Sequence, residues 1–210
     1  MLSCGAVTEN RYHHGDLPAA LLAAVRELVA EVGASAVSLR QVSQRAGVSV
    51  AAPSHHFGDK RGLLTAFAIE GLEQLGDSLA RASATAGSEP RDRIRAIARG
   101  YVSFAIEHPE HFAVVFRPEL YDEEDPGLRA VGDRNFGLLA DAVEEAQRTG
   151  WCTSQDSLEL AVATWAAIHG MATLWVEGLV DQRIRAGGPT SLITTVLAAL
   201  GLSARSSDGS

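Results

Sequence analysis

The sequence has few of the residues that mark secreted or membrane-spanning proteins. Only two cysteines, Cys4 and Cys152, occur in 210 residues, which is too few for a disulfide framework. No apolar run reaches the roughly 18–20 residues that a membrane span needs. Residues 1–10 lack a basic flank followed by an apolar stretch, so we expect no signal peptide. We predict free thiols, a reducing cytoplasm and no membrane partner.

Motifs for catalysis or cofactor binding are equally scarce. The chain has no glycine-rich phosphate loop, no Gly-x-Ser-x-Gly and no Cys-x-x-Cys. His108 and His111 lie three residues apart, but Pro109 breaks the register between them, and a metal site needs three or four converging ligands. The carboxylates of 122–125 are typical of a solvated loop. We therefore predict no catalytic residues, no metal, no cofactor and no enzyme activity.

The net charge of −8 is unevenly distributed. Residues 1–64 carry six basic and five acidic side chains, whereas the remaining residues carry twelve basic and twenty-one acidic ones. A local basic patch matters more for nucleic-acid binding than the overall sum. The chain has such a patch in residues 38–61, and the acidic charge belongs to the rest. Its cations are Arg40, Arg45, Lys60 and Arg61, and its only acid is Asp59.

Apolar residues recur at helical spacing in almost every segment, and strand patterns are scarce. We predict an all-α fold of about nine helices. Asp16 is expected to cap the first helix, with Pro18 in its first turn, and Gly33 to end it. A long fourth helix is expected to begin after Asp59. Further helices are expected near 94–104, 112–116, 128–148, 156–180 and 189–200, with loops at 84–90 and 121–127.

Two short predicted helices surround Gly47, with the spacing of a DNA-binding helix-turn-helix. The first is expected to be capped by Ser38, with Gln41 reaching back. The second is expected to be capped by Ser49 and to enter the major groove. Spacing and charge favour DNA binding, although such helix pairs also occur in other helical proteins. The predicted DNA-binding residues are Ser38, Ser49, Val50, Ala51, Ser54, His55, His56 and Lys60, with His13 and His14 as either arm contacts or a solvated tail.

The C-terminal two thirds holds most of the aromatic residues, which could line an apolar pocket between helices. Aromatic residues at helical spacing are more often simply core, so we expect only two or three of them at the pocket. His169 is either a core histidine bonded to a neighbouring helix or part of the pocket wall. The predicted ligand-binding residues are Phe104, Phe112, Phe116, Trp165, His169 and Trp175.

The segment 156–180 is apolar on every side of its predicted helix. A helix of this kind must be covered on all sides. Together with 189–200 it carries more apolar surface than one chain can cover. We therefore expect these two helices to pair with their copies as a four-helix bundle in a homodimer, whose two-fold symmetry suits a palindromic DNA site.

The run Ala46-Gly47-Val48-Ser49, followed by His56-Phe57, Lys60 and Leu63-Leu64, resembles the signature of TetR-family regulators. The resemblance implies a three-helix DNA-binding head at 11–58 and a ligand-binding and dimerisation body at 59–202. We expect residues 1–10 and 203–210, outside both, to be disordered. Trp165, followed by His169-Gly170, is similar to the motif that names the subgroup with a WHG C-terminal domain.

Two positions depart from the family pattern. Pro53 and Ser54 stand where the family usually has leucine and a phosphate-contacting tyrosine. Ser54 has a shorter reach, and Pro53 disfavours helical geometry at Ala52. The resemblance implies a cytoplasmic repressor that a small-molecule effector releases from a palindromic double-stranded DNA operator. The alternative is a ligand-binding or protein-interaction module without specific DNA binding.

Overall fold

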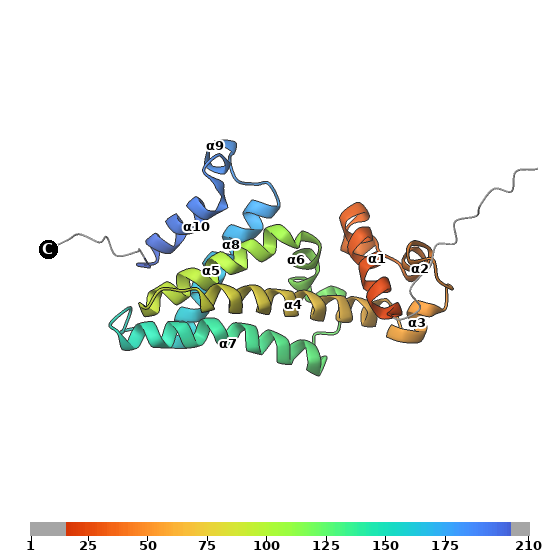
Figure 1. Cartoon of the computed structure of the whole chain (residues 1–210), viewed down its shortest axis with the longest axis horizontal. Coiled ribbons are helices and arrows are strands. Elements are labelled where there is room, and N and C mark those ends of the chain that lie inside the picture. Colours follow the sequence, from red (N-terminus) through yellow and green to blue (C-terminus); the bar gives the residue numbers. More distant parts are fainter. Residues whose placement is uncertain (1–15, 203–210) are drawn as a thin grey trace, which may run out of the picture. The chain divides into compact units, whose positions relative to one another are not determined.

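The computed structural model describes residues 16–202 (Figure 1). The predictions for His13, His14, residues 1–10 and residues 203–210 lie outside that range. All regular structure within it is helical, with ten α-helices and two short 3-10 segments, and this confirms the all-α class. The expected number of about nine is exceeded because α9, Gln182–Arg185, is a single turn in a stretch without a helical pattern. Two compact units divide the chain, residues 1–60 and 61–210.

The first unit contains three helices, α1 (Leu17–Val32), α2 (Leu39–Ala46) and α3 (Ala52–Phe57), with a 3-10 turn between the first two. Asp16 caps α1, as predicted, because its carboxylate accepts a backbone hydrogen bond from the first turn. Gly33 ends α1, also as predicted. Helix α2 packs on α1 and α3 packs on α2.

The core of the first unit follows the helical spacing of its apolar residues. Leu21 and Val25 on α1 and Val42 on α2 are fully buried. Each such side chain contributes about 1.5–3 kcal/mol when it is removed from water. This small core fixes α2 against α1, and α2 then positions the turn that leads into α3.

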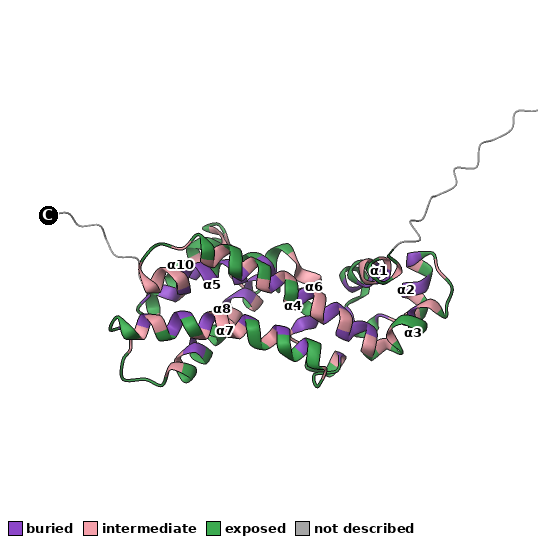
Figure 2. Ribbon diagram, turned by 60° about the horizontal axis from the view of Figure 1, so that its bottom comes forward, coloured by how far each residue is buried: buried purple, intermediate pink, exposed green. Residues whose placement is uncertain are grey.

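The second unit is organised around α5, which packs against α6, α7, α8 and α10. Each of these helices turns a buried stripe toward the others and leaves its remaining residues to solvent (Figure 2). Helix α8 ends earlier than the predicted 180, at Val176, and Gly178 follows with a φ of 73°. The helices of this unit are α4 (Lys60–Ala84), α5 (Pro90–Glu107), α6 (Pro109–Val115), α7 (Pro126–Arg148), α8 (Ser157–Val176), α9 (Gln182–Arg185) and α10 (Gly188–Ala199).

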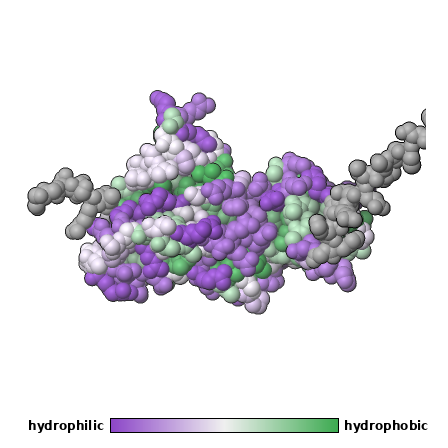
Figure 3. All heavy atoms as spheres, in the orientation of Figure 1, coloured by the Kyte–Doolittle hydropathy of each residue, from purple (hydrophilic) through white to green (hydrophobic). Residues whose placement is uncertain are grey.

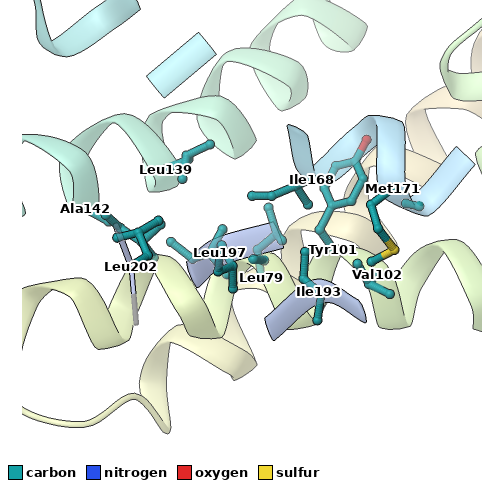
Figure 4. Packing of buried hydrophobic residues seen from close by; sticks show 14 of the residues in the cluster. Leu79, Tyr101, Val102, Leu139, Ala142, Ile168, Met171, Ile193, Leu197 and Leu202 are labelled. Carbon is teal, nitrogen blue, oxygen red and sulfur yellow. The ribbon is translucent and has the colours of Figure 1, made fainter. Parts of the chain in front are cut away.

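The hydrophobic core of the second unit joins all its long helices. Leu79 on α4, Tyr101 on α5, Ile168 on α8 and Leu197 on α10 belong to one buried cluster (Figure 4). The apolar stripe predicted for the last helix therefore points into this chain's own core. Among residues 16–202, no helix combines the length and the apolar character needed to cross a bilayer.

Candidate functional site

The turn between α2 and α3 has the geometry of a helix-turn-helix. Gly47 ends α2 in the left-handed region, with φ 68° and ψ 32°, which a residue without Cβ adopts at little cost. Ser38 caps α2 as predicted, since its Oγ accepts a hydrogen bond from the Gln41 amide at 3.4 Å. The Ser38 hydroxyl also donates to Oε1 of Gln41 at 2.5 Å, so the side chains of these two predicted capping residues are bonded to each other.

The prediction that Ser49 caps the second helix is wrong. Helix α3 begins at Ala52, its cap position is Ala51, and no side chain bonds to its first turn. Pro53 causes this shift, because proline is accommodated only in the first turn of a helix. Ser49, Val50 and Ala51 consequently lie in the turn and not on α3.

The surface around α3 is nonetheless open to a partner. The three turn residues Ser49, Val50 and Ala51 are all exposed, and Val50 is 63% exposed. Pro53 is buried and anchors the helix. Beyond it, Ser54, His55 and His56 project outward as three consecutive exposed residues. The predicted DNA-binding residues between Ser49 and His56 are thus exposed on one continuous segment.

The cations of the basic patch have different environments. Arg45 forms ion pairs with Glu27 at 3.0 Å and with Glu31 at 2.6 Å, both on α1, and its hydrogen bonds lower the pKa of Glu31. Lys60 donates to the backbone oxygen of Ser35 at 2.7 Å, which leaves two of its three N–H donors. Arg40, a cation of the patch that is not among the predicted DNA-binding residues, is exposed on α2 and has no ion pair within residues 16–202.

A cavity of about 290 Å³ lies among α4, α5, α7 and α8 in the second unit. Its walls are mainly aliphatic and aromatic, as is typical of small-molecule sites. Within the described part of the chain, no lysine, arginine, aspartate, glutamate or histidine lines it. The lining residues are Leu72, Leu75, Leu79, Ile97, Tyr101, Phe116, Gly132, Asn135, Phe136, Leu139, Trp165 and Ile168.

Only two of the six predicted ligand-binding residues, Phe116 and Trp165, line this cavity. Phe104 is fully buried and packs beside the ring of His108. Trp175 is buried and lies under the guanidinium of Arg185, 4.5 Å from its ring centre. These two aromatic rings fill space between helices and do not face the cavity.

The other two predicted residues, Phe112 and His169, form a layer behind the cavity wall. Their rings lie 5.1 and 4.6 Å from that of Phe116. Nδ1 of His169 forms a hydrogen bond with the Tyr101 hydroxyl, 2.8 Å away, and the tautomer of the imidazole decides which of the two atoms donates. Burial lowers the pKa of His169 and raises that of Tyr101. The bond between a neutral imidazole and a neutral phenol fits the core-histidine interpretation of this residue.

Sequence reasoning missed the two polar residues of the cavity wall, Tyr101 and Asn135. Asn135 is the only asparagine in residues 16–202 and interrupts the apolar spacing of α7, a signal that could have identified it. It is only 5% exposed. Its Nδ2 donates to the backbone oxygen of Leu72 at 2.7 Å, and its Oδ1 has no hydrogen-bond partner among the described residues.

Helix α8 carries an apolar face that residues 16–202 leave uncovered. Leu158, Val162 and Trp165 are 59%, 45% and 36% exposed, and they recur at helical spacing. Leu174 is 48% exposed, but at 100° per residue it lies on the opposite side of the helix from Trp165. In the view of Figure 3, hydrophobic residues reach the surface in the region of α8 and α10. On α10 itself the outward residues are small, as Thr194 is.

Two family sequence models match the chain, one in each part. Residues 21–67 match the model described as bacterial regulatory proteins of the tetR family. Residues 94–200, half of the chain, match the model described as a tetracyclin repressor-like C-terminal domain. The chain belongs to the TetR family. That family consists of DNA-binding transcriptional regulators that respond to ligands. The C-terminal description does not name the WHG subgroup, so that finer assignment stays a prediction.

Curated relatives agree with membership of the TetR family. The HTH-type transcriptional regulator BetI of Burkholderia cenocepacia HI2424 is 38% identical over 176 residues, which cover 81% of this chain and 84% of the relative. BetI of Stenotrophomonas maltophilia R551-3 is 38% identical to this chain over 80 residues, and the matched part spans only 41% of that protein's length. Both relatives carry the description of a transcriptional regulator.

Solved structures share the TetR fold. A protein of unknown function from Rhodococcus sp. RHA1 has a TM-score of 0.75 and 36% identity, covering 92% of this chain and 96% of that one. The TetR-family regulator PfmR from Thermus thermophilus has a TM-score of 0.69 at 18% identity, covering 89% of this chain and 99% of that one.

No cluster of three or more metal-ligating side chains occurs among residues 16–202.

Proposed function

We propose that this chain is a repressor that binds a palindromic DNA operator as a homodimer and is released by a small molecule. The observation that carries the proposal is the joint presence of an exposed helix-turn-helix and an apolar cavity in a chain whose two parts both match TetR models. Such a regulator works on chromosomal DNA, so the proposal includes a cytoplasmic location.

For DNA binding, we assign base reading to the segment from Val50 to His55 and phosphate contacts to Ser49, His56 and Lys60. The exposure of this segment supports the assignment. Ser38 contributes less, because its hydroxyl is engaged within α2. We add Arg40 as a phosphate contact, since it is exposed and has no acidic partner in the described range.

For dimerisation, the exposed apolar face of α8 supports pairing of α8 and α10 with their copies. Large apolar patches of monomeric proteins commonly mark interaction sites. Leu158, Val162 and Trp165 would be removed from water by the pairing, and the small outward residues of α10 would permit a close approach. Two recognition segments related by a two-fold axis would then match the two halves of a palindrome.

For regulation, α4 is the element that joins operator binding and the cavity. It begins at Lys60, a proposed phosphate contact, and contributes Leu72, Leu75 and Leu79 to the cavity wall. A ligand alters DNA affinity only by binding one setting of this helix better than another. We propose that the ligand-bound setting is the one with weaker operator affinity.

The alternative, a binding module without specific DNA recognition, is favoured by one observation. Helix α3 carries no lysine or arginine, and Arg45 is engaged by two glutamates. Phosphate contacts supply much of the affinity in DNA complexes, so a head with few available cations could bind weakly. The experiment below separates the two functions.

The test is binding of the purified full chain to labelled fragments of the DNA upstream of its own gene, at low and moderate salt. A repressor binds one palindromic fragment selectively, and Lys60→Ala weakens binding to all fragments alike. Arg81→Ala is the matched control, because Arg81 is an exposed cation on α4 well outside the head. Equal, weak binding to every fragment at both salt concentrations would favour the alternative.

A further inference from the structure

The segment 49–56, which runs from the turn after α2 through most of α3, has no side chain that can form a bidentate pair with a base. It reads Ser-Val-Ala-Ala-Pro-Ser-His-His. Arginine and lysine commonly read guanine, asparagine and glutamine read adenine, and carboxylates accept from cytosine. All six of these residue types are absent from the segment. The base feature that its apolar side chains can match is the C5-methyl group of thymine.

Val50 is the apolar side chain of the segment that is most open to a partner. It is 63% exposed, whereas the only other exposed large apolar residue within residues 16–60 is Val32, at 45%. Ala51, which follows, is exposed as well, so methyl groups cover the tip of the turn. In helix-turn-helix complexes the beginning of the second helix lies against base edges in the major groove. The thymine methyl group projects into that groove.

Backbone hydrogen bonds fix the turn that carries Val50. The Ala52 amide donates to Ser49 O at 3.0 Å. This bond closes a turn with Val50 and Ala51 at its two central positions. The His55 amide then donates to Ala51 O at 2.9 Å and continues the turn into α3. Val50 is therefore presented with little backbone freedom left to lose on binding.

The polar side chains of the segment are less selective. Ser54, His55 and His56 are exposed. A serine hydroxyl both donates and accepts, so it pairs with more than one base. Each imidazole forms single hydrogen bonds, at a base or at a phosphate. These groups add affinity but discriminate less sharply than a bidentate pair, which leaves the apolar contact of Val50 as a distinct source of sequence preference.

We infer that Val50 reads one thymine in each half of the operator, by van der Waals contact between its methyl groups and the C5-methyl group of the base. This inference rests on the proposed function, because it names the base that the proposed recognition segment selects. Loss of one buried methyl group weakens binding about fourfold, and loss of one in each half of a palindrome weakens it about fifteenfold.

Deoxyuridine tests the contact directly, because uracil lacks the C5-methyl group of thymine and keeps its hydrogen-bonding groups. The full chain first selects a palindromic duplex from a randomised pool. Each symmetric pair of thymines is then replaced by deoxyuridine, and affinity is measured by fluorescence anisotropy. We expect one pair to weaken binding about fifteenfold. At that pair, 5-methylcytosine opposite guanine should bind more tightly than cytosine opposite guanine, because it retains the methyl group.

Two valine variants test whether the effect belongs to Val50. Val50→Ala removes both γ-methyl groups, so deoxyuridine at the sensitive pair should weaken its binding less than about twofold. Val32→Ala is the matched control, since Val32 is the other exposed valine of the head and lies on α1. It should keep the full effect of deoxyuridine. An equal effect in Val50→Ala, or the absence of any sensitive thymine pair, overturns the inference.

The selection step separates this inference from the proposed function. If the full chain selects no duplex and binds all of them alike, the proposed operator binding and the thymine contact are both wrong. If it selects a palindrome whose affinity does not change with deoxyuridine at any position, the proposed function stands and Val50 is not a thymine reader.

Discussion

The Tyr101 hydroxyl lies 2.8 Å from Nδ1 of His169, so a polar bond joins α5 to α8 directly behind the wall of the cavity. The ring of Phe116 packs 4.6 Å from the imidazole, and that of Trp165 packs 5.8 Å from it. The pair therefore supports two of the aromatic residues that a ligand would touch. Its contribution to stability and its dependence on pH can both be measured.

Tyr101→Phe removes the hydroxyl and leaves Nδ1 of His169 without this partner. We expect the free energy of unfolding to fall by about 1–2 kcal/mol, as is usual when one member of a buried hydrogen bond is lost. Urea unfolding of Tyr101→Phe, of His169→Leu and of the double variant measures the coupling. Additive losses in the double variant would show that the two residues do not stabilise each other.

The lowered pKa of His169 predicts a loss of stability in acid. Burial holds its pKa below the usual 6.5 in the folded chain, so near neutral pH the imidazole is uncharged whether folded or unfolded. As the pH falls below about 6.5, the unfolded chain takes up the proton first, and stability declines until the folded pKa is passed. The contribution is thus fully present above about pH 6.5 and lost below it. His169→Leu should flatten this part of the urea-midpoint profile, and an unchanged profile would contradict the assignment.

Local caps were predictable from the sequence, and the composition of the cavity wall was not. Asp16 and Ser38 cap their helices as expected, because a cap depends on a bond within three residues. The predicted cap at Ser49 is wrong because Pro53, four residues later, decides where α3 begins. The cavity depends on how four helices pack, and helical spacing alone does not separate Phe104, which fills the core, from Phe116, which lines the cavity.

Ser38→Ala and Ser49→Ala should behave differently in spite of their similar chemistry. Ser38→Ala removes a cap and should cost about 1 kcal/mol of stability. Ser49→Ala removes no cap, so its unfolding midpoint should be unchanged, while its DNA affinity should fall if Ser49 contacts a phosphate. Chemical denaturation and DNA titration of both variants measure the two effects. A stability loss in Ser49→Ala would restore the capping role that the structure denies it.

The salt dependence of DNA binding should identify which arginines contact phosphates. Arg40→Ala should reduce the slope of log affinity against log salt by about 0.9, the value for one lost phosphate contact. Arg45→Ala should change the slope little and destabilise the head instead, because Arg45 is paired with Glu27 and Glu31. Arg81→Ala is the matched control for charge. If Arg45→Ala reduced the slope as much as Arg40→Ala, Arg45 would have to exchange its glutamates for a phosphate.

Val162→Glu should test whether the exposed face of α8 is a dimer interface. Val162 is 45% exposed in the single chain, so a glutamate there is tolerated if the face is open to solvent. In a two-fold interface it would bury an unpaired charge in each copy, at a cost of about 3 kcal/mol or more. Ala130→Glu, on an exposed position of α7, is the control for adding the charge. Sedimentation equilibrium should show Val162→Glu as a folded monomer and Ala130→Glu as a dimer.

Because a monomer reaches only one half of a palindrome, the operator affinity of Val162→Glu should fall when the dimer is lost. An intact Val162→Glu dimer would show that the interface does not lie on this face.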